Sequence, residues 1–389
     1  MRKYRKVIII IIILMAALLV AVTGLMSPGV TQTRECSLIY IPKIKDDTND
    51  FWSSLISGCK MAAEEYGSKL EIMAPDKEEN IEEQNRLLKA AIEKEPDAIL
   101  FSPSSMSASD KLLKKAKEKG ITINFGSEFE FYLFKQDENG NNTFVPLDQG
   151  GYMDIAPLDK GENIRREICL TLSEMGIDPE VSHHEMGPGQ NEIDFRYSQA
   201  LQAADNAATF KWVVEALANM QGLVADFSPK PIEDAPGNGM HINMSVQSHE
   251  ELLMPFMAGI LHHIEEMTLF LNPSKDSYKR MGKDKAPSFI SWSYQNRNQL
   301  IRIPATHSSN RMELRSPDCS CNIYLAYALL IYAGLEGIEK NMIPDPCTDV
   351  VSVDTKRLPQ SLKEAKLIAS NASWLKEILG NDIVDIYVG

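Results

Sequence analysis

Acidic side chains alternate with aromatic ones in the segment SEFEFYLF, which begins at Ser127. Glu128 and Glu130 alternate there with Phe129 and Phe131. Successive side chains of a strand point to opposite faces, so both carboxylates are expected on one face and both rings on the other. One strand of this kind is usually half exposed, with its acidic face in solvent. Chemistry here therefore depends on whether other segments bring further polar groups to the same place.

Three further segments carry such groups. In HHEMGPGQNEIDFRY, Glu185 precedes a Gly-Pro-Gly turn and Glu192 follows it, so the turn returns the second carboxylate toward the first. The segments GNGMHINMSV and NRMELRSPD are expected to be strands, and in each the alternate residues share a face. The side chains on these two faces are His241, Asn243 and Ser245, and Arg311, Glu313 and Arg315.

The combination indicates a site for divalent cations and phosphate. Five carboxylates, one imidazole and several guanidinium groups would repel one another or lose hydration unless such ions lay among them. Oxygen-rich ligation with a single His is typical of Mg2+ or Mn2+. The planar fork of Arg can bind phosphate or a carboxylate through two hydrogen bonds.

Two different patterns of elements would position these groups. Up to about Phe125, short apolar runs alternate with amphipathic segments, which predicts βαβ units and a parallel sheet. The predicted strands are 37–41, 70–74, 98–103 and 121–125, and the predicted helices are 49–67, 80–94 and 109–119. This half is expected to be an α/β, Rossmann-like half-domain without the Gly-rich signature of a dinucleotide site. After Gly126, polar-faced strands separated by long helices predict an α+β domain.

The N-terminus predicts a targeting segment. Arg2, Lys3, Arg5 and Lys6 precede an apolar run from Val7 to Val22. A basic flank before an apolar run of this length is typical of a signal peptide or of a single uncleaved anchor. We expect residues 1–25 to be one of these and the protein to be anchored in a membrane.

Composition excludes other classes. The chain has 389 residues, enough for two or three domains, and a formal net charge of -14. No basic excess is available to neutralise a nucleic-acid backbone, so nucleic acid is not an expected partner. The six Cys show no C-x-x-C pair, which argues against a zinc site or disulfide framework and predicts mostly buried thiols.

The first half resembles the first lobe of periplasmic sugar-binding proteins of the ribose-binding type. The resemblance rests on IPKIKDDTNDFWSSLISGCKMAAEEYG and PDAILFSPSS, and we assign it residues 35–124. It implies that Asp50, Phe51 and Trp52 meet a sugar ligand. Phe51 and Trp52 are equally suited to packing the first helix onto the sheet.

The second half resembles the catalytic domain of bacterial-type glutamine synthetases. SEFEFYLF, HHEMGPGQNEI, GNGMH, SYKR, NRNQLIRIP, NRMELRSPD and NIYLAYALLIYAGLEGI match that family in order, and we assign the resemblance residues 125–389. It implies a curved antiparallel sheet and an ATP-dependent ligase that joins ammonia to glutamate through γ-glutamyl phosphate. It also implies glutamate, ammonium and ATP as substrates, with two Mg2+ or Mn2+ sites.

The resemblance also implies roles for single residues. It assigns Glu130, Glu185 and Glu192 to the metal near glutamate, and Glu128, His241 and Glu313 to the metal that bridges the ATP phosphates. The other residues it assigns are Gly237, Arg280 and Arg315 for substrate, Arg297 for phosphate and catalysis, and Arg302 and Arg311 for ATP. Asn243 and Ser245, on the His241 face, are further candidates for binding ATP.

The sequence departs from the family at two functional points. The β-grasp domain that completes the neighbouring subunit's site in that family has no counterpart, and the first lobe stands in its place. Lys285 occupies a flap position where many members carry Glu, and a Lys repels ammonium, although the adjacent Asp284 is a candidate substitute. We therefore expect impaired ammonia capture and no normal assembly of the family's homo-oligomeric rings.

A non-enzymatic alternative follows from the same departures. It is a membrane-anchored sugar-binding or scaffold protein with a relic ligase domain. An ATP-consuming domain judged alone would be cytoplasmic, which conflicts with export, and the two resemblances meet near Asn124–Gly126. His262, His263, Glu265 and Glu266 have helical metal-ligand spacing, but we interpret them as the solvated face of a helix.

Overall fold

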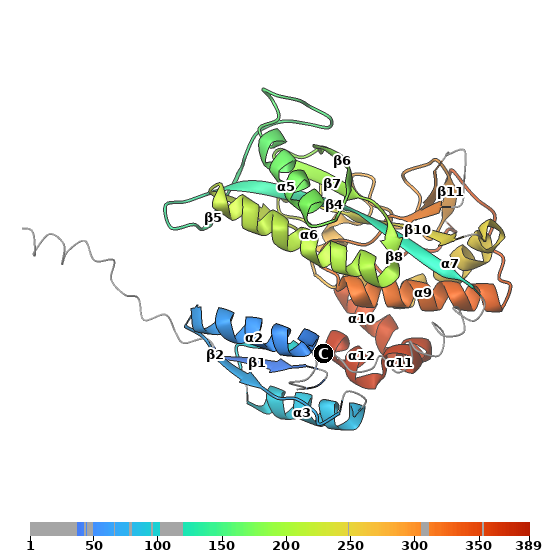
Figure 1. Cartoon of the computed structure of the whole chain (residues 1–389). Coiled ribbons are helices and arrows are strands. Elements are labelled where there is room, and N and C mark those ends of the chain that lie inside the picture. The colour runs from blue at the N-terminus through green and yellow to red at the C-terminus, as the bar shows by residue number, and fades with distance from the viewer. Residues whose placement is uncertain are drawn as a thin grey trace, which may run out of the picture. The chain divides into compact units, whose positions relative to one another are not determined.

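The computed structural model describes residues 37–42, 44, 50–65, 67–77, 80–94, 96–101, 120–247, 249–304, 311–351 and 354–389 (Figure 1). By its internal contacts the chain divides into two compact units, Met1–Met106 and Ser107–Gly389. The predicted helix 109–119 lies outside the described residues.

The first unit contains a three-stranded parallel sheet. Its strands are β1 (Ser37–Ile41), β2 (Lys69–Ile72) and β3 (Ala98–Phe101), in the order β2-β1-β3. Its helices are α2 (Asp50–Glu65) and α3 (Ile81–Glu93). Asn80 caps α3, since its Oδ1 accepts a hydrogen bond from the Glu83 amide at 3.2 Å. The side chains of Asp50, Phe51 and Trp52 lie outside what the structure describes.

The second unit is built on a ten-stranded mixed sheet with the main order β11-β12-β13-β10-β4-β7-β6. The expected antiparallel arrangement needs correction, because β11 and β12 pair in parallel and the other pairs are antiparallel. The strands are β4 (Thr122–Gln136), β5 (Asn142–Pro146), β6 (Pro179–His184), β7 (Gln190–Phe195), β8 (Ser198–Gln199), β9 (Leu223–Asp226), β10 (Met240–Gln247), β11 (Trp292–Tyr294), β12 (Ile301–Ile303) and β13 (Arg311–Leu314).

Helices cover one face of this sheet. In Figure 1, α6 and α9 run along the long strand β4. The Phe129 ring lies 4.9 Å from that of Phe210 on α6, and the Phe125 ring lies 4.2 Å from that of Tyr327 on α9. The helices are α5 (Glu162–Glu174), α6 (Ala200–Met220), η1 (Glu250–Leu252), α7 (Leu253–Leu271), α8 (Ser277–Arg280), α9 (Ile323–Glu339), α10 (Leu362–Asn371), α11 (Ser373–Leu379) and α12 (Asn381–Val388).

The strand β4 carries the predicted alternation of faces. Phe125, Phe129 and Phe131 are buried under the helices, whereas Glu128 and Glu130 are only partly buried. Residues 122–125 were expected to be the last strand of the first lobe. They instead begin β4 and pair with β10, from Thr122 opposite Gln247 onward.

For the part of the chain that the structure describes, the expectation of a membrane anchor is wrong. Among the described residues, no helix combines the length and the apolar character needed to cross a bilayer. Residues 1–25, on which that expectation rested, lie outside the described part of the chain.

The helix α7 shows a second difference. His262 is exposed, but His263 is buried and its ring stacks on Trp374 with centroids 3.9 Å apart. The predicted solvated face is therefore wrong for His263, because α11 packs over it. Of the described cysteines, Cys319 and Cys321 are buried, and Cys59, Cys169, Cys319, Cys321 and Cys347 are all free thiols.

Candidate active site

Strand register brings the acidic segments together on the sheet face opposite the helices. On β4 and β7, Glu128 lies opposite Asp194 and Glu130 lies opposite Glu192. On the other side of β4, His241 of β10 lies opposite Glu128. Side chains on directly opposed residues of neighbouring strands contact one another, so a square of carboxylates forms beside one imidazole.

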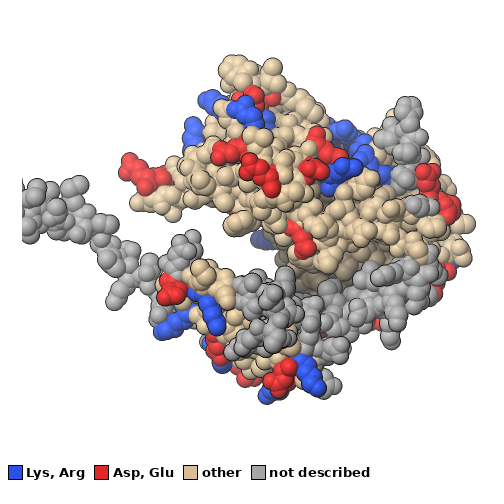
Figure 2. All heavy atoms as spheres, in the orientation of Figure 1, with Lys and Arg blue, Asp and Glu red and all other residues tan. Residues whose placement is uncertain are grey.

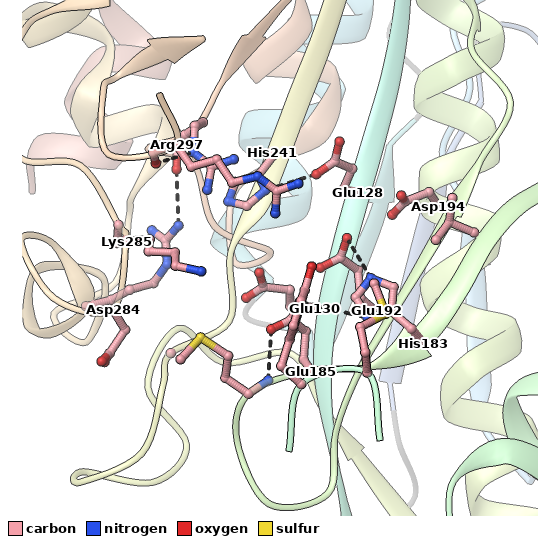
Figure 3. A pocket seen from close by; sticks show the side chains of 18 of the residues that line it. Glu128, Glu130, His183, Glu185, Glu192, Asp194, His241, Asp284, Lys285 and Arg297 are labelled. Atoms are coloured by element: carbon pink, nitrogen blue, oxygen red, sulfur yellow. Dashed lines mark hydrogen bonds and ion pairs between the residues drawn. The ribbon is translucent and has the colours of Figure 1, made fainter. Parts of the chain in front are cut away.

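This face opens into a cavity of about 250 Å³. Figure 3 shows the carboxylates and imidazoles on the strands, with Asp284, Lys285 and Arg297 across from them on loops. Of the residues expected at the site, the cavity lining contains Glu128, Glu130, Glu185, Glu192, Gly237, His241, Arg280, Asp284, Lys285, Arg297, Arg302 and Arg315.

One group of potential cation ligands consists of Glu128, His241 and Glu313. The Nδ1 atom of His241 lies 3.0 Å from Oε2 of Glu128 and 3.5 Å from Oε1 of Glu313. Burial alone would raise the pKa of Glu128, but the hydrogen bond and the charge of His241 lower it to about 2. Glu313 is fully buried and forms ion pairs with Arg302 and Arg315.

A second group consists of His183, Glu185 and Glu192. His183 Nε2 lies 3.6 Å from Oε1 of Glu192, and its Nδ1 lies 3.9 Å from Oε1 of Glu185. Burial, reinforced by the charge of Glu192, raises the pKa of Glu185 to about 7. This group therefore holds more negative charge than its neighbours neutralise.

Glu130 lies in the same cavity, and we expected it to share a cation with Glu185 and Glu192. Its hydrogen-bond partners differ from theirs. Its Oε2 accepts hydrogen bonds from the amide of Gly239 at 2.7 Å and from Nε2 of Gln190 at 3.4 Å. Burial raises the pKa of Glu130, although His241 opposes the shift. His183 lies beside Glu185 and Glu192 in addition to Glu130, which is directly opposite Glu192 on the paired strands.

Basic groups line the opposite wall. Arg280 is buried, and its guanidinium donates to the carbonyl oxygens of Ser316 at 2.9 Å and Arg315 at 3.3 Å. Arg297 and Lys285 are exposed at the mouth, and the Lys285 ammonium lies 5.8 Å from the centre of the Tyr152 ring. Such an arrangement can hold an anion against the acidic strands only if cations lie between them.

Three expected nucleotide contacts, Asn243, Ser245 and Arg311, are described but lie outside the cavity lining. Asn243 donates to Oε1 of Glu128 at 2.8 Å, so it acts on the first ligand group. Ser245 and Arg311 lie opposite each other on β10 and β13, and Arg311 is exposed.

The structure adds residues that we did not predict from the sequence. Asp194, two positions after Glu192, joins the carboxylate square; burial, reinforced by Glu192 and Glu128, raises its pKa to about 10. Tyr152 and Met153 reach the cavity from the loop between β5 and α5. The alternation in NEIDF places Asp194 on the face of Glu192, and this signal could have identified it.

A third group of Asp148, Asp159 and His184 lies behind the cavity. His184 Nε2 lies 2.9 Å from Oδ1 of Asp148. Burial opposes both shifts, yet the contact raises the pKa of His184 and lowers that of Asp148. A buried ion pair therefore lies directly before Glu185 in the chain.

The charges on the outer surface are mixed. Described Lys and Arg side chains are interspersed with Asp and Glu on the face shown in Figure 2.

Fold and site together define a class: a helix-covered mixed sheet whose open face presents two groups of potential divalent-cation ligands beside arginines. The family model for the glutamine synthetase catalytic domain matches residues 107–389, and the chain belongs to the glutamine synthetase family. A periplasmic binding protein domain matches residues 43–145, so the first region is similar to that family.

Individual proteins similar to this chain include several glutamine synthetases. A glutamine synthetase of Methanosarcina mazei is 42% identical over 319 residues, covering 75% of this chain and 71% of that protein. One from Clostridium saccharobutylicum is 40% identical over 319 residues, covering 75% and 72%. A solved structure described as a GmaS/ADP complex has a TM-score of 0.66 at 28% identity, covering 75% of this chain and 76% of that one. A Plasmodium falciparum glutamine synthetase, at 21% identity over 73% of this chain and 74% of that one, shares the fold with a TM-score of 0.62.

Proposed function

We propose that the chain is an ATP-dependent ligase that forms glutamine from glutamate and ammonia through γ-glutamyl phosphate. The observation that carries the proposal is the pair of ligand groups on one sheet face, with arginines on the facing wall. The ADP named for a structurally similar protein supports nucleotide binding by this chain.

The donor set fits two divalent cations. Glu128, His241 and Glu313 would hold one, and Glu130, Glu185 and Glu192 the other, with His183 beside the second. The raised pKa of Glu185 supports this assignment, because uncompensated carboxylates favour a cation or a proton. We propose Mg2+ or Mn2+, which when bound would neutralise charge on the transferring phosphoryl group.

The remaining residues are proposed to bind and orient the substrates. Arg280 and Arg315, with the backbone of Gly237, would bind the carboxylates of glutamate. Arg297 and Arg302 line the cavity and would face the phosphates. Arg311, Asn243 and Ser245, which lie outside the lining, would act at the outer part of ATP or through Glu128.

The test of this proposal is glutamate-dependent phosphate release from ATP, measured with Mn2+ in the presence and absence of ammonium. Release in the intact chain and its loss in Glu185→Ala support the ligase. No release under either condition would overturn it.

The ammonia step is proposed to be the weak one. Lys285 places a positive charge at the cavity mouth, and Lys230 lies 3.7 Å from Asp284, the other candidate acid there. Both cations disfavour ammonium. Lys285→Glu should lower the KM for ammonium by roughly tenfold, about 1.4 kcal/mol. Lys275→Glu, an equal charge change at an exposed position outside the cavity lining, should change it less; equal effects would contradict a specific role for Lys285.

The first unit is proposed to be a Rossmann-like half-domain that binds a sugar through residues near the start of α2. Its parallel order β2-β1-β3 and the binding-protein match support this. A rise in melting temperature on adding ribose would support sugar binding, and no rise with a panel of monosaccharides would count against it.

Two further proposals concern organisation. We propose a lobe followed by a catalytic domain, with the joint before β4 rather than inside it, since residues 122–125 pair with β10. We also propose that the family's large rings do not assemble normally here, and a stable dodecamer in light scattering would contradict this.

A further inference from the structure

The loop between β5 and α5 carries Tyr152 and Met153 into the cavity, and a buried acidic residue lies at each of its ends. Asp148 at the start is 5% exposed, and Asp159 at the end is 3% exposed. Neither residue lines the cavity. Buried carboxylates are costly unless they are fully paired, so their partners show what they hold in place.

Asp148 accepts four hydrogen bonds. Its Oδ1 accepts from the amide of Gly150 at 3.1 Å, the amide of Gly189 at 2.9 Å and Nε2 of His184 at 2.9 Å. Its Oδ2 accepts from the amide of Lys160 at 2.8 Å. The donors belong both to the loop and to the strand and turn that flank Glu185, so one carboxylate ties the two segments together.

His184 extends this connection to the ligand segment. Its Nδ1 lies 2.6 Å from the carbonyl oxygen of Glu185, and its own carbonyl oxygen accepts from the amide of Met153 at 3.0 Å. Both ring nitrogens face acceptors, so both donate. The His184 side chain, which is fully buried, thus fixes the backbone of Glu185 on one side and Asp148 on the other.

The far end of the loop is held by a second buried pair. Arg165 of α5 donates to both oxygens of Asp159, at 3.2 and 2.6 Å. The same guanidinium donates to Asn191 on β7 at 2.6 Å and to Ser182 on β6 at 3.2 Å. Both ends of the loop are therefore joined to the two strands that carry the second ligand group.

These contacts distinguish the group from a metal site, although its donor atoms are close enough for one. Each oxygen of Asp148 and Asp159 already accepts from a backbone or guanidinium N–H, and both nitrogens of His184 donate. A cation would have to displace satisfied hydrogen bonds. The potential ligand atoms of this group are therefore already occupied by hydrogen bonds within the protein.

We propose that Asp148 is a positioning residue that holds the Tyr152 loop and the Glu185 turn as one unit, so that the second cation site is formed before substrate enters. The proposal rests on the proposed function, because it concerns the same cavity. It predicts that disrupting the hydrogen bonds of Asp148 weakens cation binding at the Glu185 site. Cation binding by Glu128, His241 and Glu313 should be unchanged.

Two adjacent glycines provide a matched pair of variants. A Cβ at Gly150 would lie 2.8 Å from Nε2 of His184, directly in the Asp148 contact. A Cβ at Gly151 would meet nothing nearer than Oδ2 of Asp154, at 3.8 Å. Gly150→Ala therefore wedges the contact apart without removing a charge, and Gly151→Ala is the control.

Hydrogen exchange of the metal-free protein tests the coupling directly. Gly150→Ala should speed exchange about tenfold or more in both 147–160 and 185–190, because both segments donate to Asp148. Gly151→Ala should exchange like the unchanged chain. Faster exchange in only one segment, or none in either, would overturn the proposal.

Mn2+ titration by calorimetry tests the consequence. In Gly150→Ala one Mn2+ should bind with unchanged affinity and the other about 10- to 100-fold more weakly, as for outer partners of metal ligands. Equal weakening of both sites would indicate general damage and overturn the assignment.

If Gly150→Ala does not fold, Asp148→Asn replaces it, with Asp137→Asn as its control. Asp137 accepts a similar set of hydrogen bonds in the exposed turn between β4 and β5. Failure of the proposed function is seen separately, as absence of glutamate-dependent phosphate release in the unchanged chain. The exchange experiment remains decisive in that case.

Discussion

Three carboxylates of the cavity relieve their mutual repulsion in different ways. Glu128 keeps its charge because His241 contacts it, and its pKa falls to about 2. Burial and Glu192 raise the pKa of Glu185 to about 7. Asp194, which lies among three acidic neighbours, reaches about 10. A metal-free cavity of this kind holds protons where a loaded one would hold cations.

The first prediction concerns the pH dependence of stability without metal. Glu185 binds a proton more tightly in the folded than in the unfolded chain, so its contribution is fully present below about pH 4.5 and is lost as pH rises through about 7. The free energy of unfolding should fall across this window by up to about 1.4 kcal/mol per pH unit for this one group. Denaturant unfolding in EDTA at pH 5, 6 and 7 measures it.

Glu185→Gln is the control for that slope, since it cannot titrate. Between pH 5 and 7, the unfolding free energy of the variant should fall less steeply with pH than that of the unchanged chain. The difference in slope should correspond to about one bound proton. Identical slopes would show that Glu185 titrates normally.

The second prediction concerns Asp194. Its Oδ1 is buried without a hydrogen-bond partner, and its neighbours are acidic. Asp194→Asn should therefore raise the melting temperature of the metal-free protein at pH 8 by roughly 2–4 °C, as expected for about 1 kcal/mol. It should also weaken Mn2+ binding, because an amide, unlike a carboxyl group, cannot release a proton and become negatively charged beside the cation. An unchanged or lower melting temperature would contradict this account.

At the residue scale, alternation in SEFEFYLF was enough to predict that Glu128 and Glu130 face away from a buried aromatic face. Alternation within a strand gives no distances between strands. The place of His183 beside Glu192 follows from the register of β6 with β7, which the Gly-Pro-Gly turn alone did not determine.

At the element scale, the helices α7 and α9 approach so closely that their glycines touch. A Cβ at Gly337 would lie 2.1 Å from the carbonyl oxygen of Pro255, and one at Gly259 would lie 2.0 Å from that of Ala333. Backbone atoms cannot move aside as a flexible side chain can. The close packing of α7 against α9 stabilises the layer of helices that covers the sheet.

The third prediction tests that crossing. Gly337→Ala should destabilise the second unit by about 1–3 kcal/mol or more, because the helices must separate. Gly58→Ala in α2, where a Cβ meets no atom within 4 Å, should instead stabilise its helix by about 0.5–1 kcal/mol. Equal effects of the two substitutions in thermal unfolding would show that the close approach is absent.

The fourth prediction concerns His263, which joins three helices. Its Nδ1 lies 2.8 Å from Glu266, and its Nε2 lies 3.1 Å from Glu336 on α9. His263→Phe can keep the stack on Trp374 but leaves both carboxylates without the imidazole, and should cost about 1–3 kcal/mol. His262→Phe, at the exposed neighbour, should cost less in urea unfolding; an equal loss would contradict a specific role.

Local signals predicted several elements well. Asn80 and the apolar spacing that follows it predicted the helix now seen at Ile81–Glu93. The pattern could not show that residues 122–125 join the larger sheet, since a short β-rich run fits either one. The parallel pairing of β11 with β12 depends on the path of the loop between them, residues 295–300, and side-chain alternation does not show strand direction.

At the scale of the whole molecule, the two compact units have different relatives, and the proposed chemistry lies in the second. The fifth prediction is that residues 107–389 expressed alone bind two Mn2+ with the affinity of the full chain. Calorimetric titration of both proteins measures this. If Mn2+ binds only when the first unit is present, the proposal that the second unit alone binds the cations is contradicted.

The order of the motifs was enough to predict the family. Their alternation was enough to predict which face of the sheet carries the acidic side chains. In the proposed function, ammonia capture would depend on groups at the mouth of the cavity, such as Lys285 and Tyr152, whose positions come from loops. Loop positions are the part that composition and periodicity do not determine.

The most direct test is product formation. The chain is incubated with glutamate, ATP, Mn2+ and ammonium labelled with the heavy nitrogen isotope, and the products are analysed by mass spectrometry. We expect labelled glutamine together with phosphate from the intact chain and neither product from Glu185→Ala. Absence of both products from an intact chain that binds Mn2+ would contradict the assignment as a ligase.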